Sequence, residues 1–281
     1  MEVLGQDLRP GTALFRVESA PMFRSILTIL SFVAATLVVA PLVIVTALID
    51  SHAPVVDRLI RLWGRILARA SGAELSVEGL EKLDPAKRYV LVPNHASYLD
   101  IPCLLTALDT QPIRFMAKAS LFKVPILGWG MLAAGFIPID RNRSSKGKAS
   151  FDLAARRIRG GNTIVIFPEG GRSHARTMKP FKHGAFLLAM KSGLPLVPIA
   201  IRGTYDVLPP STLIIKPGRV KIVVGDPVDV SELSVKQKNE LVQSTRATIL
   251  EMLEQTEEPS SVPPPAEETH RMQNAERRTG E

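Results

Sequence analysis

The hydrophobic pattern of the chain begins with a long apolar run that contains no charged residue, from Ile26 to Ile49. As a helix, these 24 residues would extend over about 36 Å, enough to cross a hydrocarbon core of about 30 Å. The run is longer than the apolar part of a cleaved signal peptide, and it lacks the polar stripe of a helix in a soluble domain. It therefore predicts a membrane-embedded segment, in which Pro41 allows either a kinked span or a hairpin that enters and leaves by one face.

Residues 54–70 have a different pattern, with apolar residues at helical spacing on one face. Four arginines form a stripe on another face: Arg58, Arg61, Arg65 and Arg69. Such a pattern is typical of a helix in the headgroup layer, with its apolar face in the lipid and its arginines on phosphates. A soluble amphipathic helix packed on the core would show the same pattern. The position directly after an apolar segment favours the interfacial interpretation.

From residue 88 onward, short strand-like runs alternate with helical ones. Six runs predict strands, most of them apolar on both faces and hence covered on both sides: YVLVP, IRFMA, GFIPI, TIVIF, LVPIAI and VKIVVG. Helices are expected near residues 97–108, 120–134, 145–159 and 181–191, with a last one at 234–255. This alternation predicts an α/β fold, a single layered domain with a mixed, largely parallel sheet covered by helices. Ligands of such a domain bind near the carboxyl ends of the strands.

These patterns divide the chain into four parts. We expect a polar N-terminal segment at 1–25, membrane-attachment helices at 26–72, the α/β domain at 73–256 and a tail at 257–281. The tail is rich in proline, glutamate and serine and has no apolar period, which predicts disorder.

Charge and cysteine content narrow the class of partner. The net charge of +8 indicates an anionic partner, such as a lipid surface, an acidic protein or nucleic acid. Nucleic acid is disfavoured because the basic residues are not interleaved with aromatic ones. The single cysteine, Cys103, excludes an intramolecular disulfide and a multi-cysteine zinc site, and no metal is expected.

A histidine and an aspartate occur five positions apart twice, as His95 with Asp100 and as His52 with Asp57. Residues at this spacing lie about 140° apart on a helix, so the pair can meet only if the histidine precedes the helix. In NHASYLD, Ser97 is a good N-cap that would place Asp100 in the first turn, although the same pattern also describes simple capping. His95 follows a predicted strand, whereas the other pair belongs to the start of the amphipathic helix. We therefore predict that His95 and Asp100 form the catalytic pair.

Two further predicted strands end in charged loops. GFIPIDR delivers Arg141, and TIVIFPEGGRS breaks at a proline and releases a loop with arginine donors suited to phosphate. Lys118 adds positive charge at the end of IRFMAK. The candidate binding residues are Lys118, Arg141, Glu169, Gly170, Gly171, Arg172 and Ser173.

NHASYLD, GFIPIDR, FPEGGRS and VPIAI, in this order over about residues 88–202, resemble the four motif blocks of the glycerolipid acyltransferase family. This family includes 1-acyl-glycerol-3-phosphate acyltransferases. The third block usually has threonine where Gly171 stands, and the second often has phenylalanine where Pro138 stands. These departures bear on substrate preference rather than on the class of reaction.

The resemblance implies acyl transfer from a thioester, on acyl carrier protein or coenzyme A, to the sn-2 hydroxyl of lysophosphatidic acid. The thioester is a co-substrate, and no cofactor is implied. His95 would be the general base and Asp100 would orient it. The acceptor phosphate would be held by Arg141 and Arg172, with Lys118, while Glu169 would orient these groups or the glycerol hydroxyls. Two glycines, Gly170 and Gly171, would let the backbone approach the ligand.

The same resemblance implies a protein on a membrane with an anionic surface, specifically the cytoplasmic face of a bacterial inner membrane. Three alternatives stay open: acylation of an ornithine lipid, acylation of a lysophospholipid with a larger headgroup, or lipid binding without catalysis.

Overall fold

The computed structural model describes residues 19–50, 54–140, 144–173 and 177–255. Within them, seven strands form one sheet in the order β1-β7-β6-β2-β5-β3-β4. Neighbouring strands are parallel except β6 and β7, which are antiparallel. The predicted mixed, largely parallel sheet is therefore confirmed. The strands are β1 (Ala73–Glu78), β2 (Val90–Pro93), β3 (Ile113–Lys118), β4 (Ile137–Ile139), β5 (Thr163–Val165), β6 (Leu196–Arg202) and β7 (Gly218–Val224).

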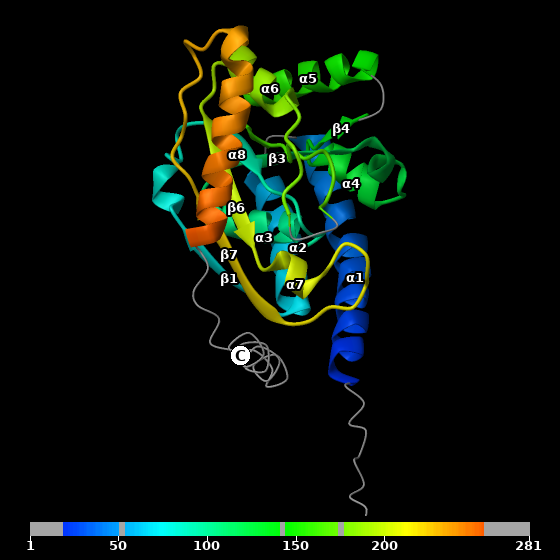
Figure 1. The fold of residues 1–281 in the computed structure, drawn as a ribbon. Coiled ribbons are helices and arrows are strands. Elements are labelled where there is room, and N and C mark those ends of the chain that lie inside the picture. Colours follow the sequence, from blue (N-terminus) through cyan, green and yellow to red (C-terminus); the bar gives the residue numbers. More distant parts are fainter. Residues whose placement is uncertain (1–18, 51–53, 141–143, 174–176, 256–281) are drawn as a thin grey trace, which may run out of the picture.

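Helices cover both faces of this sheet (Figure 1). Side chains alternate along the central strand β2, where Leu91 belongs to one core cluster and Val90 and Val92 to the other. The cluster around Leu91 includes residues of α1 (Ser19–Ile49), α2 (Pro54–Ser71), α3 (Asp100–Ala107) and η2 (Ala119–Lys123), and α4 (Leu127–Ala133) packs against it. The other cluster is closed by α5 (Ser144–Arg159), α6 (Gly184–Ser192) and α8 (Lys238–Gln255). Short helical turns complete the structure: η1 (Leu80–Lys82), α7 (Thr204–Val207) and η3 (Val235–Gln237).

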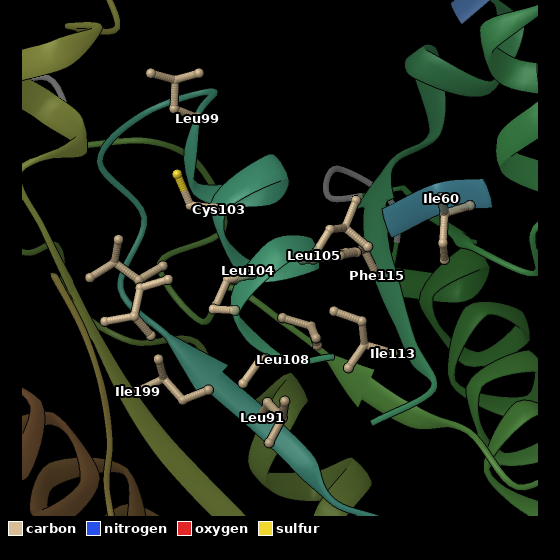
Figure 2. Packing of buried hydrophobic residues seen from close by; sticks show 14 of the residues in the cluster. Ile60, Leu91, Leu99, Cys103, Leu104, Leu105, Leu108, Ile113, Phe115 and Ile199 are labelled. Carbon is tan, nitrogen blue, oxygen red and sulfur yellow. The ribbon is translucent and has the colours of Figure 1, made fainter. Parts of the chain in front are cut away.

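The cluster under α3 lies directly below the loop that carries the predicted catalytic pair. Figure 2 shows Cys103 and Leu104 of α3, with Leu108 directly after the helix, above Leu91 of β2 and Ile199 of β6. All five side chains are at most 1% exposed. This close packing gives α3, and the loop that precedes it, a rigid support.

The amphipathic helix α2 differs from the expectation. Its apolar stripe packs against α1 and α3 inside the protein, with Val56, Ile60 and Leu67 buried. The predicted insertion of this face into lipid is therefore wrong, because the stripe is covered by protein rather than by a membrane. The arginine face points outward, where Arg58 and Arg65 are exposed.

The apolar helix α1 lies along the α/β domain instead of standing clear of it (Figure 1). Ile215 N donates to Ser25 Oγ (2.8 Å) and Trp63 Nε1 donates to Thr36 Oγ1 (3.0 Å). In the C-terminal half of α1, Ala40 packs closely on Gly130 of α4. A Cβ added at Gly130 would lie only 2.6 Å from the Cβ of Ala40. In the described part of the chain, α1 is the one helix long and apolar enough to cross a membrane, with 28% of its most apolar stretch buried.

The elements differ from the expected ones at two further places. The sequence does not predict the edge strand β1. The helix expected at 120–134 is broken into η2 and α4, because Pro125 and Ile126, whose φ is positive at 65°, separate the two. Residues 1–18 and 256–281 lie outside the described residues, and with them most of the polar N-terminal segment and the whole predicted tail.

Candidate active site

The candidate residues gather at one edge of the sheet. His95 follows β2, Glu169 follows β5 and Lys118 ends β3, and these three strands are neighbours in the order β2-β5-β3. Because the strands are parallel, their carboxyl ends meet at the same edge, where ligand sites of α/β folds lie.

The pair His95 and Asp100 is in hydrogen-bond contact. His95 Nδ1 lies 2.7 Å from Asp100 Oδ2, and the aspartate is fully buried. The same oxygen accepts hydrogen bonds from the backbone nitrogens of Ala96 (2.8 Å) and Ser97 (2.9 Å). A carboxylate oxygen in this position only accepts, so the neutral imidazole has its proton on Nδ1 and its lone pair on Nε2. The ring is also stacked on Phe167, with centroids 4.0 Å apart.

The expected helix cap at Ser97 is wrong. The helix begins at Asp100, and its N-cap residue Leu99 has helical backbone angles and makes no side-chain cap. Ser97 Oγ instead accepts from Leu99 N (3.1 Å) and donates to the carbonyl oxygen of Leu208 (2.7 Å). The aspartate side chain itself binds the backbone of the preceding turn, so the turn and the pair form one unit.

Glu169 connects the two motif loops. Its Oε1 accepts from His95 N (2.7 Å), and its Oε2 accepts from Lys179 N (2.9 Å) and from the hydroxyl of Ser173. Ser173 N donates in turn to His95 O (2.9 Å). Both side chains are nearly fully buried. Glu169 and Ser173 thus hold the backbone of His95 from both sides, a role that the sequence alone does not reveal.

Arg172 lies at the surface end of this network. Its guanidinium carbon is 3.4 Å from the ring centroid of Tyr98, and its Nη1 donates to Pro210 O at 3.4 Å. The loop reaches this position through Gly170, which has a left-handed backbone (φ 70°). A Cβ at Gly170 would meet only the flexible end of the exposed Lys182 side chain, so the backbone conformation, rather than packing, favours glycine there. Gly171 is half-buried and has no left-handed backbone.

The other candidates lie at the margin of the site. Lys118 is exposed at the end of β3. Arg141, two residues beyond β4, and His52 of the second histidine–aspartate pair both fall outside the described residues. Asp57 of that second pair binds Arg114 Nη1 at 2.6 Å, so its carboxylate is occupied by an arginine of β3.

Cys103 is a buried residue of α3, the helix that begins at Asp100, and its thiol is unreactive. Burial raises the pKa of its thiol to about 12, and the charge of Asp100 raises it in the same direction. The group therefore stays a neutral thiol over the whole physiological pH range, and it is unsuited to nucleophilic attack.

An apolar cavity of about 490 Å³ borders the site. It is lined at one end by Tyr98 and Leu99 of the catalytic loop, the segment 94–99 between β2 and α3, and it continues between the sheet and the N-terminal helices. Its walls are lined mainly by α1, α2, α3 and α4, with Phe115 of β3 and the 208–215 loop. The site therefore places the imidazole of His95, supported by the buried carboxylate of Asp100, beside an apolar cavity. Such an arrangement can activate a hydroxyl group next to a bound hydrocarbon chain.

Comparison with known proteins agrees with this class. The acyltransferase family model matches residues 74–202. A chloroplastic 1-acyl-sn-glycerol-3-phosphate acyltransferase of Brassica napus is 31% identical over 201 residues, 68% of this chain and 58% of the relative. A mouse 1-acyl-sn-glycerol-3-phosphate acyltransferase alpha is 31% identical over 181 residues, 64% of this chain and 63% of the relative. The crystal structure of the 1-acyl-sn-glycerophosphate acyltransferase PlsC from Thermotoga maritima is similar with a TM-score of 0.69 and 25% identity, covering 84% of this chain and 97% of that chain.

Residues 74–202 thus match the acyltransferase family, and the chain is similar to 1-acyl-sn-glycerol-3-phosphate acyltransferases in both sequence and fold. It spans less than two thirds of the length of these two curated relatives, at 58% and 63%.

Proposed function

We propose that the protein transfers a fatty acyl group from a thioester to the sn-2 hydroxyl of lysophosphatidic acid, which gives phosphatidic acid. The observation that carries this proposal is the contact of 2.7 Å between His95 and the buried Asp100, beside an apolar cavity that Tyr98 and Leu99 line. The names of the relatives, which are 1-acyl-sn-glycerol-3-phosphate acyltransferases, support the same acceptor.

In the proposed reaction, His95 Nε2 removes the proton of the acceptor hydroxyl while the hydroxyl oxygen attacks the carbonyl carbon of the thioester. The C–O bond forms and the C–S bond then breaks, and the imidazolium returns its proton to the departing sulfur. Asp100 stabilises the imidazolium and keeps Nδ1 protonated, as the carboxylate of a hydrolase triad does. Among the described residues of this edge, the Ser97 hydroxyl donates to Leu208 O, the buried Ser173 hydroxyl donates to Glu169, and Cys103 is a buried neutral thiol, so none of the three is presented as a nucleophile. Direct transfer without an acyl-enzyme is therefore the simpler route.

Two features match the parts of the substrates that do not react. The 490 Å³ cavity offers an apolar space for a fatty acyl chain, beginning beside the catalytic loop. Arg172 offers forked donors to a phosphate at the same edge of the sheet, and Lys118 with Arg141 would extend this positive charge. The donor, acyl carrier protein or coenzyme A, stays a prediction.

The test is a purified full-length enzyme assayed against a panel of lysolipids with both acyl-carrier-protein and coenzyme A thioesters. We expect labelled acyl groups on lysophosphatidic acid at a kcat/KM at least ten-fold above that for lyso-ornithine lipid and for lysophospholipids with larger headgroups. A higher value for one of the latter would assign that acceptor instead. Absence of transfer to every lysolipid would favour a lipid-binding protein without catalysis.

We also propose that the protein works on a membrane surface, with the outer side of α1 against lipid. This side carries exposed apolar residues along its length, and the neighbouring α4 adds exposed Trp129 and Leu132. The lysolipid acceptor and its product also reside in a bilayer. The compartment expected from the sequence, the cytoplasmic face of a bacterial inner membrane, stays a prediction.

After cell lysis without detergent, we expect the full-length protein to sediment with membranes, to resist extraction by 1 M salt and to be released by detergent. Salt resistance is expected because burial of apolar surface is not screened, whereas attachment through the exposed arginines alone would be. Recovery in the supernatant before detergent is added would contradict membrane attachment.

A further inference from the structure

The side chain of Tyr98 has no role in the reaction described so far, although it stands between the two catalytic-pair residues in the sequence. It is 53% exposed, which is unusual for an aromatic residue in so buried a loop. One side of this residue lines the apolar cavity, and its ring face carries the guanidinium of Arg172.

The contact with Arg172 is a close stack, at 3.4 Å from the guanidinium carbon to the ring centroid. A guanidinium in this arrangement is attracted by the ring face, while its N–H donors point outward in its own plane. Stacking therefore holds the cation without using its hydrogen-bond donors. Within the described residues, those donors meet one acceptor, Pro210 O at the long distance of 3.4 Å.

The position of Tyr98 relative to the catalytic base is set by the backbone. Ala96 N and Ser97 N bind the Asp100 carboxylate on one side of Tyr98, and Leu99 N binds Ser97 Oγ on the other. These hydrogen bonds close the turn that directly follows His95, so the turn fixes where Tyr98 stands relative to the base.

Arg172 is held at its other end as well. Lys179 Nζ donates to its carbonyl oxygen, and the next residue, Ser173, donates from its backbone nitrogen to His95 O. The backbone of this loop is therefore anchored to the base, whereas the guanidinium at the end of a long side chain is oriented chiefly by the tyrosine ring.

We propose that Tyr98 is a positioning residue that presents the donor edge of Arg172 to the anionic headgroup of the acceptor at the mouth of the apolar cavity. Tyr98 thereby sets the preference for a phosphate-bearing acceptor without touching the reacting atoms. This inference rests on the proposed function, because it needs an anionic acyl acceptor at this edge.

The experiment compares Tyr98→Leu with Tyr98→Phe in the purified full-length enzyme, with lysophosphatidic acid as acceptor. Leucine keeps an apolar wall for the cavity but removes the ring face, whereas phenylalanine keeps both. For Tyr98→Leu we expect the acceptor KM to rise about 2- to 30-fold, the range of a cation–π contact between exposed and desolvated sites. Its kcat should change by less than about two-fold, and Tyr98→Phe should match the wild type in both constants. KM does not depend on the fraction of folded enzyme, so a modest loss of stability leaves this readout valid.

The same substitution is then made in an Arg172→Gln background, where the guanidinium is absent. Tyr98→Leu should there add no further rise in KM, because the two residues act through one contact. An unchanged KM in the single variant, an equal rise in the Arg172→Gln background, or a fall in kcat alone would overturn the positioning role. Transfer to lysophosphatidic acid by the wild type with any of these results leaves the proposed function standing, whereas no transfer by the wild type overturns both.

Discussion

Replacing His95 by alanine is expected to lower kcat for acyl transfer by about 10²- to 10⁴-fold, the range attributed to a positioned general base. The physical reason is that the acceptor hydroxyl keeps its proton at neutral pH and attacks a thioester poorly unless a base takes it. The contact of 2.7 Å with Asp100 occupies Nδ1, so the neutral ring of His95 has its lone pair on Nε2, where a base needs it. The measurement is steady-state transfer of a labelled acyl group to lysophosphatidic acid.

Two histidines of the same chain provide matched controls. His183 is exposed at the start of α6, and His52 repeats the spacing of the catalytic pair. Alanine at either position should keep kcat within about two-fold of the wild type, as expected for residues outside the chemical step. Because His95 is stacked on Phe167, the thermal midpoint of each variant is recorded as well. A His95→Ala enzyme that is folded and within ten-fold of wild-type kcat would remove His95 from the proposed mechanism.

Replacing Asp100 by asparagine is expected to lower kcat by a similar factor, about 10²- to 10⁴-fold. Asparagine keeps the size of the side chain and can keep an oxygen at the place of Oδ2, where His95 and two backbone nitrogens converge. It removes the negative charge that would stabilise the imidazolium. The loss should therefore appear in kcat while the KM for both substrates changes little.

The second carboxylate oxygen gives this variant an independent readout. Asp100 Oδ1 is buried and has no hydrogen-bond partner among the described residues. An amide nitrogen at this place would be a buried donor without an acceptor, at a cost of about 1–3 kcal/mol of unfolding free energy. Chemical denaturation should show this loss with an unchanged m-value. Wild-type kcat in a protein destabilised by this amount would limit Asp100 to a structural role.

The sequence predicted the site's location better than its internal connections. The strand before NHASYLD places His95 at a sheet edge, and the apolar pattern of the strands was sufficient to identify a covered parallel sheet. The role of Glu169 could not be predicted, because it depends on how two loops separated by 74 residues meet in space. A glutamate in a glycine-rich loop has the same local pattern whether it faces a ligand or a backbone nitrogen.

The errors in the predicted elements also have physical causes. The stripe of α2 is equally apolar whether it meets lipid or other helices, so periodicity alone cannot choose between them. The strand β1 lies at the edge of the sheet and alternates half-buried with exposed residues, a weaker signal than a run buried on both faces. The misplaced cap at Ser97 arose because serine followed by an acidic residue at this spacing also describes a tight turn closed by its own aspartate.

The arrangement of α1 has a practical consequence for anyone who wishes to prepare a water-soluble version of the enzyme. Deleting an N-terminal apolar helix is a common way to do this, and it succeeds when the helix is merely a tether. Here, Val39 and Val43 of α1 are buried in the core and also line the apolar cavity. Truncation before residue 54 would therefore open the cavity to water and expose Ile60 and Trp63, which line it from α2. Such a shortened protein should aggregate rather than dissolve, so preparations should retain α1 and use detergent or nanodiscs.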